Sequence, residues 1–421
     1  MSLKRRDFIN LSSIAAATGI VSGLSSFTNS GKRHDDKLRS MTDGVEPITV
    51  KEREARIAKA QRLLIENKMQ ALVLDCGTAL KYFTGISWWP SERTMVAIIP
   101  ANGTVKYVCP AFEEARLREL ISIGKDVYPW QEDESPYKLI TTVFKDAGIQ
   151  SGTIAIEERL RFFIMDGIQK EVSHLNYSSG DPITMPCRMI KSATEIALMQ
   201  KASDITLAAI KIGAGQLKEG MSQHDLASII ETAQAEMGGS SPGALCLFGE
   251  ASAFPHGTTV PRNLKKGDIV LMDCGCQVHG YCSDITKTIV FGEPTKRQEQ
   301  IWELEKRSQA AGFAAAKIGS PCEAVDAASR KVIVDAGFGP GYKLPGLPHR
   351  TGHGIGMDGH EWGNMVKGNK KLLEPGMCFS IEPTISIIGE FGVRFEDCVY
   401  MTAEGPKWFS QPSRLIREPF I

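Results

Sequence analysis

Residues 271–288 read LMDCGCQVHGYCSDITKT, and this stretch decides how the C-terminal half of the chain folds. Two β-rich runs lie on either side of a turn that contains Gly280. Antiparallel pairing of these runs would set Asp273 and Asp284 side by side, with both side chains able to point to the same face. Two aspartates on a buried face repel each other strongly unless a cation is present. Either aspartate alone could instead cap a turn or pair with a lysine such as Lys287.

Three further candidate ligands lie downstream of this stretch. His353 belongs to the segment HRTGHGIG at 349–356, where its glycine neighbours let the backbone approach a site closely. Glu382 follows an apolar run and Glu396 follows Arg394 by two residues. Carboxylates are seldom buried unless they are paired or bound to a metal. At strand spacing Arg394 shares a face with Glu396, so it either forms an ion pair with that carboxylate or orients it from outside the metal shell.

Together these five side chains form a set of four carboxylates and one imidazole. Such a set carries more negative charge than one divalent cation needs, whereas two cations bridged by shared carboxylates would balance it. A pair of this kind activates water at neutral pH. The sequence therefore predicts a dinuclear metal centre and a hydrolase.

Length and composition describe a soluble globular protein of two domains. The chain has 421 residues, too many for one ordinary core, with 42% hydrophobic and 23% charged residues. Its 49 basic and 49 acidic residues balance, which gives no reason to expect nucleic acid or an anionic membrane as a partner. The ten cysteines show no disulfide-framework spacing, so most are interpreted as small buried hydrophobes.

Patterns along the chain place the domain boundary near residue 190. A capping box at 49–52 opens a region of alternating helix and strand patterns, which predicts an α/β domain over 46–190 after a polar linker at 31–45. A second capping box at 192–195 opens a long helix and starts the second domain, 191–421, in which strand patterns dominate.

The first thirty residues differ in kind from the rest. The segment Lys4-Arg5-Arg6-Asp7-Phe8 precedes a weakly apolar run that is too short for a membrane span of about 20 residues. Residues 1–30 resemble a twin-arginine export signal, although Lys4 departs from the usual small polar residue. The resemblance implies the twin-arginine translocase as a partner during export and a periplasmic or exported protein, anchored if the signal stays uncleaved. The alternative is an ordinary basic start on a cytoplasmic protein.

The order of the five candidate ligands and the HRTGHGIG segment resemble the pita-bread metallopeptidases (M24), within the Xaa-Pro aminopeptidase and Xaa-Pro dipeptidase (prolidase) branch. The resemblance covers nearly everything after the signal. It implies an α/β (α+β) fold class, with a creatinase/prolidase-like N-terminal α/β domain followed by a pita-bread catalytic domain. It also implies a homodimer or higher homo-oligomer. Trp88 and Trp89 lie in a segment that reaches a neighbouring subunit's site in relatives, although an ordinary tryptophan pair is an equally good interpretation.

The resemblance assigns each ligand a position around two divalent metal ions. Asp273 would bind one ion, and Asp284 and Glu396 would bridge both. His353 and Glu382 would complete the shell of the second ion. Zinc, manganese and cobalt each fit, and the oxygen-rich ligand set favours manganese.

The resemblance also implies the catalytic residues and the substrate. A metal-bridging hydroxide would attack the scissile carbonyl of an Xaa-Pro bond in a short proline-containing peptide. Glu382 would shuttle the proton and His360 would stabilise the oxyanion. His256 and His349 would hold the substrate, and Arg394 would support the centre.

Several alternatives remain at this point. Another metal-dependent hydrolase or lyase could act on a non-peptide small molecule, because fold and metals do not fix the substrate. A catalytically inactive binding module is a further alternative, against which the intact ligands argue. A methionine aminopeptidase normally lacks the large N-terminal domain, and creatinase dispenses with metal. The sequence leaves the choice between aminopeptidase and dipeptidase open.

Overall fold

The structure is a computed structural model that describes residues 38–420. The expected signal at 1–30 and the linker residues before 38 lie outside the described residues. From Leu38 onward the chain forms one compact unit. Within this described part, no helix combines the length and apolar character needed to cross a membrane.

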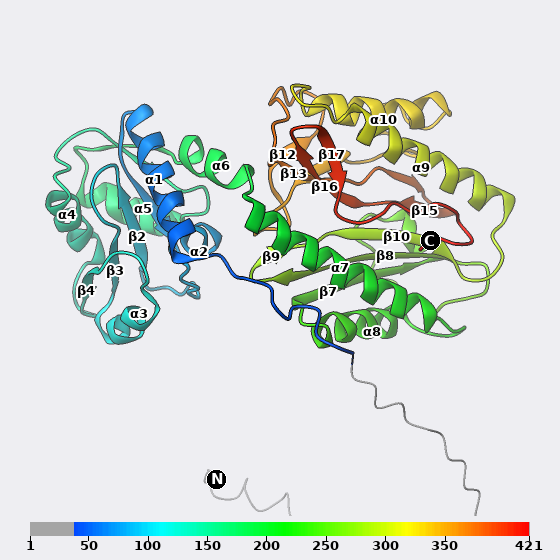
Figure 1. The fold of residues 1–421 in the computed structure, drawn as a ribbon, viewed down its shortest axis with the longest axis horizontal. Helices are drawn as coiled ribbons and strands as arrows, with labels where there is room; N and C mark the ends of the chain where they lie inside the picture. The colour runs from blue at the N-terminus through cyan, green and yellow to red at the C-terminus, as the bar shows by residue number, and fades with distance from the viewer. Residues whose placement is uncertain (1–37, 421) are drawn as a thin grey trace, which may run out of the picture. The chain divides into compact units, whose positions relative to one another are not determined.

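The N-terminal lobe is built on a six-stranded sheet (Figure 1) with the strand order β4-β3-β2-β1-β5-β6. Its strands are β1 Met69–Asp75, β2 Val96–Pro100, β3 Lys106–Pro110, β4 Asp126–Trp130, β5 Thr153–Ile156 and β6 Asn176–Ser179. Its helices are α1 Val50–Glu66, α2 Thr78–Thr84, η1 Ala111–Glu113, α3 Glu114–Leu120, α4 Pro136–Asp146, α5 Phe162–Glu171 and α6 Asp181–Met189. Strand β2 runs antiparallel to β1 and β3, and the other pairs are parallel.

Both faces of this sheet are buried, as expected of strands that read as continuous apolar runs. Successive side chains of a strand point to opposite faces. Leu72 and Leu74 of β1 accordingly belong to the core cluster shared with α1, whereas Ala71 and Val73 pack into a second cluster with α4 and α5. The α/β character predicted for this lobe is confirmed.

The C-terminal lobe contains two larger sheets and a two-stranded ribbon, with the strand orders β10-β8-β7, β12-β11-β13-β16-β17 and β14-β15. The first sheet comprises β7 Ser240–Phe248, β8 Ile269–Val278, β9 Tyr281–Cys282, which pairs with β8, and β10 Ile285–Val290. The others are β11 Gly352–Gly354, β12 Glu361–Met365, β13 Cys378–Ile381, β14 Thr384–Ile387, β15 Phe391–Arg394, β16 Asp397–Thr402 and β17 Gly405–Trp408.

Two pairs of helices cover these sheets (Figure 1). They are α7 Ala193–Gly215 with α8 Gln223–Glu236, and α9 Lys296–Ala315 with α10 Glu323–Asp335; a short helix, η2 Gly249–Ala253, follows β7. Helices α7 and α8 pack on β8 and β7, whereas α9 packs on β13, β14 and β15. The predicted capping boxes at Thr49 and Ser192 both form and begin α1 and α7.

A buried ionic cluster connects the end of the N-terminal lobe to the C-terminal lobe. Arg188, near the end of α6, donates to Glu361 of β12 at 2.6 Å and to Asp358 at 2.7 Å. Lys191, between α6 and α7, donates to the other oxygen of Glu361 at 2.9 Å. From the loop after β5, Arg159 reaches Asp358 at 3.1 Å. The carboxyl end of the N-terminal sheet therefore contributes residues beside the candidate site.

Candidate metal centre

The predicted antiparallel pairing of the two aspartate strands is present. Strand β8 pairs with β10 with Cys274 opposite Ile285, so Asp284 lies across from Gly275, two residues along the strand from Asp273. Side chains two residues apart share a face, and both carboxylates therefore point into the same cavity. Lys287 donates to Asp397 at 2.7 Å, so it does not neutralise either aspartate.

His353 lies on a very short strand, β11, which pairs with β12 and β13. A Cβ at Gly352 would lie 1.9 Å from the carbonyl oxygen of Ser380, and one at Gly354 would lie 1.7 Å from that of Trp362. Only glycine permits strands this close on both sides of His353. The imidazole Nδ1 donates to the carbonyl of Gly354 at 3.1 Å, which leaves Nε2 directed at the carboxylates.

The two glutamates come from the ends of neighbouring strands. Glu382 follows β13, and Glu396 lies between β15 and β16. Glu396 also bridges to the first sheet, because its backbone exchanges hydrogen bonds with Thr286 of β10 at 3.0 and 3.1 Å. This single bridge brings the two halves of the ligand set together.

All five candidate ligands line one cavity of about 550 Å³. His353 Nε2 lies 3.2 Å from Glu382 Oε1 and 3.7 Å from both Asp284 Oδ2 and Glu396 Oε1. Their ligand atoms form three overlapping groups: Asp273 with Asp284 and Glu396, His353 with Glu382 and Glu396, and Asp284 with His353 and His360. Glu396 joins the two groups that contain all five candidate ligands, as a bridging ligand would, and Asp284 is likewise shared by two groups.

The electrostatics of the cavity fit a bound cation. Glu396 Oε1 is buried and has no hydrogen-bond partner among the described residues. Burial, together with the charge of Glu396, raises the pKa of Glu382 to about 8 and raises the pKa of Asp284 well above its usual value. Burial also raises the pKa of Asp273, against the pull of Arg394. Carboxylates that repel one another in a buried cavity are stabilised by divalent cations.

The guanidinium of Arg394 contacts an aspartate of the site and a threonine of β10. Its Nη2 pairs with Asp273, and Nε donates to Thr286 Oγ1 at 3.2 Å. The Thr286 hydroxyl in turn donates to Glu396 Oε2 at 2.8 Å. The simple ion pair with Glu396 is therefore absent, and Arg394 reaches that carboxylate through Thr286.

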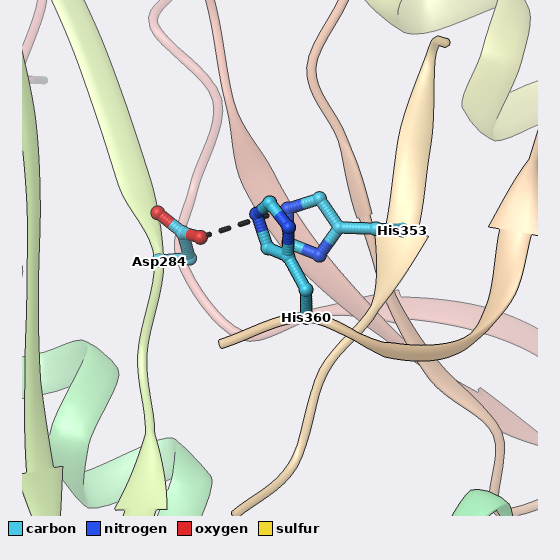
Figure 2. A group of neighbouring side chains, drawn as sticks. All are labelled: Asp284, His353 and His360. Atoms are coloured by element: carbon cyan, nitrogen blue, oxygen red, sulfur yellow. Dashed lines mark ion pairs between the residues drawn. The ribbon is translucent and has the colours of Figure 1, made fainter. Parts of the chain in front are cut away.

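The three other predicted histidines line the same cavity. The His360 ring lies against the His353 ring at a tilt of 40°, with 3.9 Å between centroids (Figure 2), and its Nδ1 accepts from Arg350 Nη2 at 3.1 Å. Burial and the neighbouring charges of His353 and Arg350 lower the pKa of His360 to about 4. His349 donates from Nδ1 to the carbonyl of Arg350 at 2.7 Å, and its Nε2 lies 3.0 Å from Thr384 Oγ1.

Figure 2 shows how Asp284, His353 and His360 point toward one another from separate elements. His256 is exposed at the edge of the cavity, next to Pro255, whose carbonyl accepts from Arg394 at 3.0 Å. The structure thus brings every predicted site residue to one cavity, with His256 at its rim.

Sequence reasoning missed Arg350 and Thr286. Arg350 lines the metal-site cavity and a neighbouring cavity of about 320 Å³, and within residues 38–420 no carboxylate lies within 4.0 Å of its guanidinium. Its position three residues before His353 was the available signal. Thr286 carried no signal, because its role depends on the bridge to Glu396.

Comparisons with known proteins agree with this architecture. The model of metallopeptidase family M24 matches residues 197–403, and the model of the creatinase/prolidase N-terminal domain matches residues 56–190. An uncharacterized peptidase of Staphylococcus aureus is 32% identical over 329 residues, which cover 77% of this chain and 90% of the relative. The chain belongs to metallopeptidase family M24.

Solved structures share the fold over most of this chain. A dipeptidase PepE from Mycobacterium ulcerans superposes with a TM-score of 0.80 at 30% identity, covering 88% of this chain and 99% of that one. A recombinant prolidase from Thermococcus sibiricus gives 0.78 at 30% identity, covering 86% and 97%. The predicted fold class, a creatinase/prolidase-like domain followed by a pita-bread domain, is confirmed. M24 members are metal-dependent peptidases, and this chain has acidic and histidine groups that could hold the metal.

Proposed function

We propose that this M24 member is a dinuclear-metal peptidase that hydrolyses the Xaa-Pro bond of short peptides. The observation that carries the proposal is Glu396, which is shared by two groups of candidate ligands and has a buried oxygen without a partner in the described chain. The similarity to solved structures described as a prolidase and a dipeptidase supports the substrate class.

The residues suit two divalent ions, with manganese favoured by the oxygen-rich set and zinc or cobalt as alternatives. Asp273 would hold one ion, Asp284 and Glu396 would bridge both, and His353 with Glu382 would hold the second. When bound, the ions would supply an activated water and a Lewis acid for the scissile carbonyl.

Glu382 is the proposed proton carrier. When a peptide bond breaks, its nitrogen must gain a proton to leave as an amine, and the proline nitrogen carries no hydrogen of its own. The Glu382 carboxylate faces the cavity 3.2 Å from His353 and can accept a proton from the attacking water and pass it to that nitrogen.

His360 is the proposed donor to the developing oxyanion. A pKa of about 4 keeps its ring neutral at pH 7. Because Nδ1 accepts from Arg350, the single ring proton resides on Nε2. That N–H can donate to the substrate oxygen. Both nitrogens of His349 are already hydrogen-bonded, so we assign His349 and the exposed His256 to the walls that hold the substrate.

Arg350 supports cleavage of dipeptides. A dipeptide that ends in proline carries its free carboxylate next to the scissile bond. Arg350 lines the cavity that holds the candidate ligands, and no carboxylate of the described chain neutralises it. An arginine presents a fork of donors that matches a carboxylate.

A direct assay tests the proposed function. Metal-reconstituted protein would be offered Ala-Pro, Ala-Pro-Gly and Ala-Ala. We expect kcat/KM for Ala-Pro to exceed that for Ala-Ala by roughly a hundredfold or more. Equal rates on Ala-Pro and Ala-Ala would remove the proline specificity, and no hydrolysis by a metal-loaded protein would favour a non-peptide substrate or an inactive binding module.

We also propose that the protein is a homo-oligomer. Three aromatic side chains are exposed at the carboxyl edge of the N-terminal sheet: Trp89 (84%), Phe112 (61%) and Phe162 (81%). Arg161, next to Phe162, donates to the carbonyl of Ser91, which joins that segment to the loop of Trp89. Soluble monomers rarely expose large apolar patches. Light scattering tests the proposal by measuring the molar mass of the wild type and of Trp89→Ser in solution. A monomeric wild type would contradict a homo-oligomer.

Export through the twin-arginine pathway is a separate proposal that rests on Arg5 and Arg6. Cell fractionation should find the wild type in the periplasm and retain the Arg5→Lys, Arg6→Lys double variant in the cytoplasm. Equal distribution of the two proteins would contradict the proposal.

A further inference from the structure

A second cavity, of about 420 Å³, lies outside the metal centre. It is bounded by the linker, by α1 and α2 of the N-terminal lobe and by the turn between β8 and β9. Its lining residues are Thr42, Pro47, Ile48, Arg53, Arg56, Lys81, Gly238, Ser240, Val278, His279, Gly280, Tyr281 and Met357. None of them belongs to the candidate metal ligands, so this cavity is a separate feature of the fold.

The charged side chains that line this cavity are all basic. Arg53, Arg56 and Lys81 face it as cations beside the imidazole of His279, and none of the lining residues is acidic. The chain as a whole contains equal numbers of basic and acidic residues, so the bias is local. A concave surface lined by cations concentrates anions.

One of these cations is neutralised within the protein. Arg56 pairs with Glu195 at 3.3 Å and donates to the hydroxyl of Tyr281 and the carbonyl of Tyr82, both at 2.9 Å. These contacts account for its burial without any ligand. Arg56 is therefore part of the protein's own structure, and the remaining cations of the lining decide what the cavity can bind.

Arg53 and Lys81 are not neutralised in this way. Arg53 lies one turn before Arg56 on α1, packs against Gly85 at the end of α2, and has a buried Nε without a hydrogen-bond partner among the described residues. Burial and the charge of Arg56 lower its pKa. The Lys81 ammonium lies over the turn, 2.7 Å from the place that a Cβ on Gly280 would occupy. No carboxylate of the described chain lies within 4.0 Å of this ammonium.

The turn itself places an imidazole at the cavity. Val278 pairs with Tyr281 across a two-residue turn in which His279 has φ 48° and Gly280 has φ 86°. Such turns favour asparagine or glycine in the first position, because few side chains tolerate a positive φ. Histidine at this position adds a further donor to the lining.

We propose that this cavity binds a compact oxyanion with two or more negative charges, such as orthophosphate or a short dicarboxylate, held by Arg53 and Lys81 with His279 beside them. The anion contacts both lobes, because Arg53 and Lys81 come from α1 and α2 whereas His279 follows β8, the strand of Asp273. A ligand that binds only the folded state stabilises it by RT ln(1 + L/Kd), where L is the free ligand concentration, so the stabilisation grows with the logarithm of that concentration once the site is saturated. The site therefore acts as an anion-dependent clamp between the lobes, independent of the reaction at the metal centre.

Titration calorimetry and thermal unfolding test the proposal on metal-loaded protein freed of excess metal. Separate arms use orthophosphate and succinate. The wild type is compared with two double variants. The pocket variant is Arg53→Gln/Lys81→Gln. The control variant is Lys51→Gln/Arg62→Gln, which likewise removes one arginine and one lysine, but from exposed positions on α1. We expect the pocket variant to lose at least about tenfold in affinity for one of the anions, and the control variant to lose none.

Thermal unfolding separates the pocket from other effects of the anions. We expect saturating anion to raise the Tm of the wild type and the control by about 3 °C more than that of the pocket variant. General salt stabilisation, or anion at the metal centre, would affect all three proteins alike. Equal affinities and equal Tm shifts in the wild type and the pocket variant would overturn the proposal. If the double variant does not fold, Lys81→Gln alone must show the weaker binding.

Discussion

Three hydrogen bonds connect Thr286 to Glu396 at the point where the two halves of the ligand set meet. Their backbones exchange hydrogen bonds at 3.0 and 3.1 Å, and the Thr286 hydroxyl donates to Glu396 Oε2 at 2.8 Å. Glu396 Oε1 has no such partner in the described chain and faces the other ligands. The threonine therefore fixes which oxygen of the carboxylate remains for metal.

Thr286→Val tests this relationship, because valine keeps the shape and the backbone bonds but removes the hydroxyl. We expect metal affinity to fall by about 10- to 100-fold, the usual effect of losing a group that orients a ligand. Competition with a chromogenic chelator measures it. Thr184→Val is the matched control, since Thr184 is equally buried but lies on α6 of the N-terminal lobe, where its hydroxyl donates to the carbonyl of Gly180. Unchanged metal affinity in Thr286→Val would contradict the role.

Asp284→Asn should remove both metal ions and the activity together. Asp284 faces Asp273 and Glu396 on one side and His353 on the other, so one change weakens the hold on both ions. Elemental analysis of the purified variant measures occupancy. Full occupancy by two ions would contradict a bridging role. Circular dichroism would show that the variant has folded.

His360→Ala should leave the metal content unchanged and lower kcat by roughly ten- to a thousandfold, the range found when one oxyanion donor is lost. Because the pKa of His360 is lowered to about 4, its ring stays neutral through the neutral range. The rate of the wild type should therefore not fall through protonation of this residue until the pH approaches 4. An unchanged kcat in the variant would remove His360 from the mechanism.

Much of the fold was predictable because local sequence patterns determine it. The capping boxes at Thr49 and Ser192 mark helix starts in any context, and the turn at Gly280 fixes the pairing of β8 with β10. The same alternation placed Asp273 and Asp284 on one face. These features depend on neighbours in the sequence, so the sequence is sufficient to find them.

The parts that were missed depend on contacts between distant segments. One of the two roles considered for Arg394 was an ion pair with Glu396, two residues away, yet Arg394 pairs with Asp273, 121 residues away in the chain. Thr286 reaches Glu396 only through the bridge between two sheets. The order of the N-terminal strands and the convergence of Arg350 on His360 likewise follow from tertiary packing.

Arg350→Gln should impair dipeptides more than blocked peptides. If the guanidinium pairs with the substrate carboxylate, KM for Ala-Pro should rise by about tenfold or more, whereas KM for the C-terminal amide of Ala-Pro should change little. An equal rise in KM for Ala-Pro and for its C-terminal amide would show that Arg350 acts only by holding His360. Arg159→Gln is the control, because Arg159 lines the neighbouring cavity but pairs with Asp358.

Glu361→Gln should destabilise the junction between the lobes. Glu361 and Arg188 have side chains only 2% and 1% exposed, and Lys191 loses the carboxylate it pairs with when Glu361 is neutralised. Breaking a buried pair from one side costs about 3 kcal/mol or more, so urea unfolding at pH 7 should show a loss of that size. Glu374→Gln, which removes only an exposed pair with Lys371, should cost less than about 1 kcal/mol.

The same carboxylate gives this junction a defined sensitivity to acid. Although burial opposes its ionisation, Lys191 and Arg188 lower the pKa of Glu361 to about 2. A carboxyl whose pKa is lower in the folded than in the unfolded state contributes fully above its ordinary pKa, about 4.3, and loses that contribution as the pH falls toward 2. The difference in unfolding free energy between the wild type and Glu361→Gln should therefore be constant from pH 7 to 5 and shrink below pH 4. A difference that stayed constant down to pH 2.5 would show that Glu361 is not the titrating group.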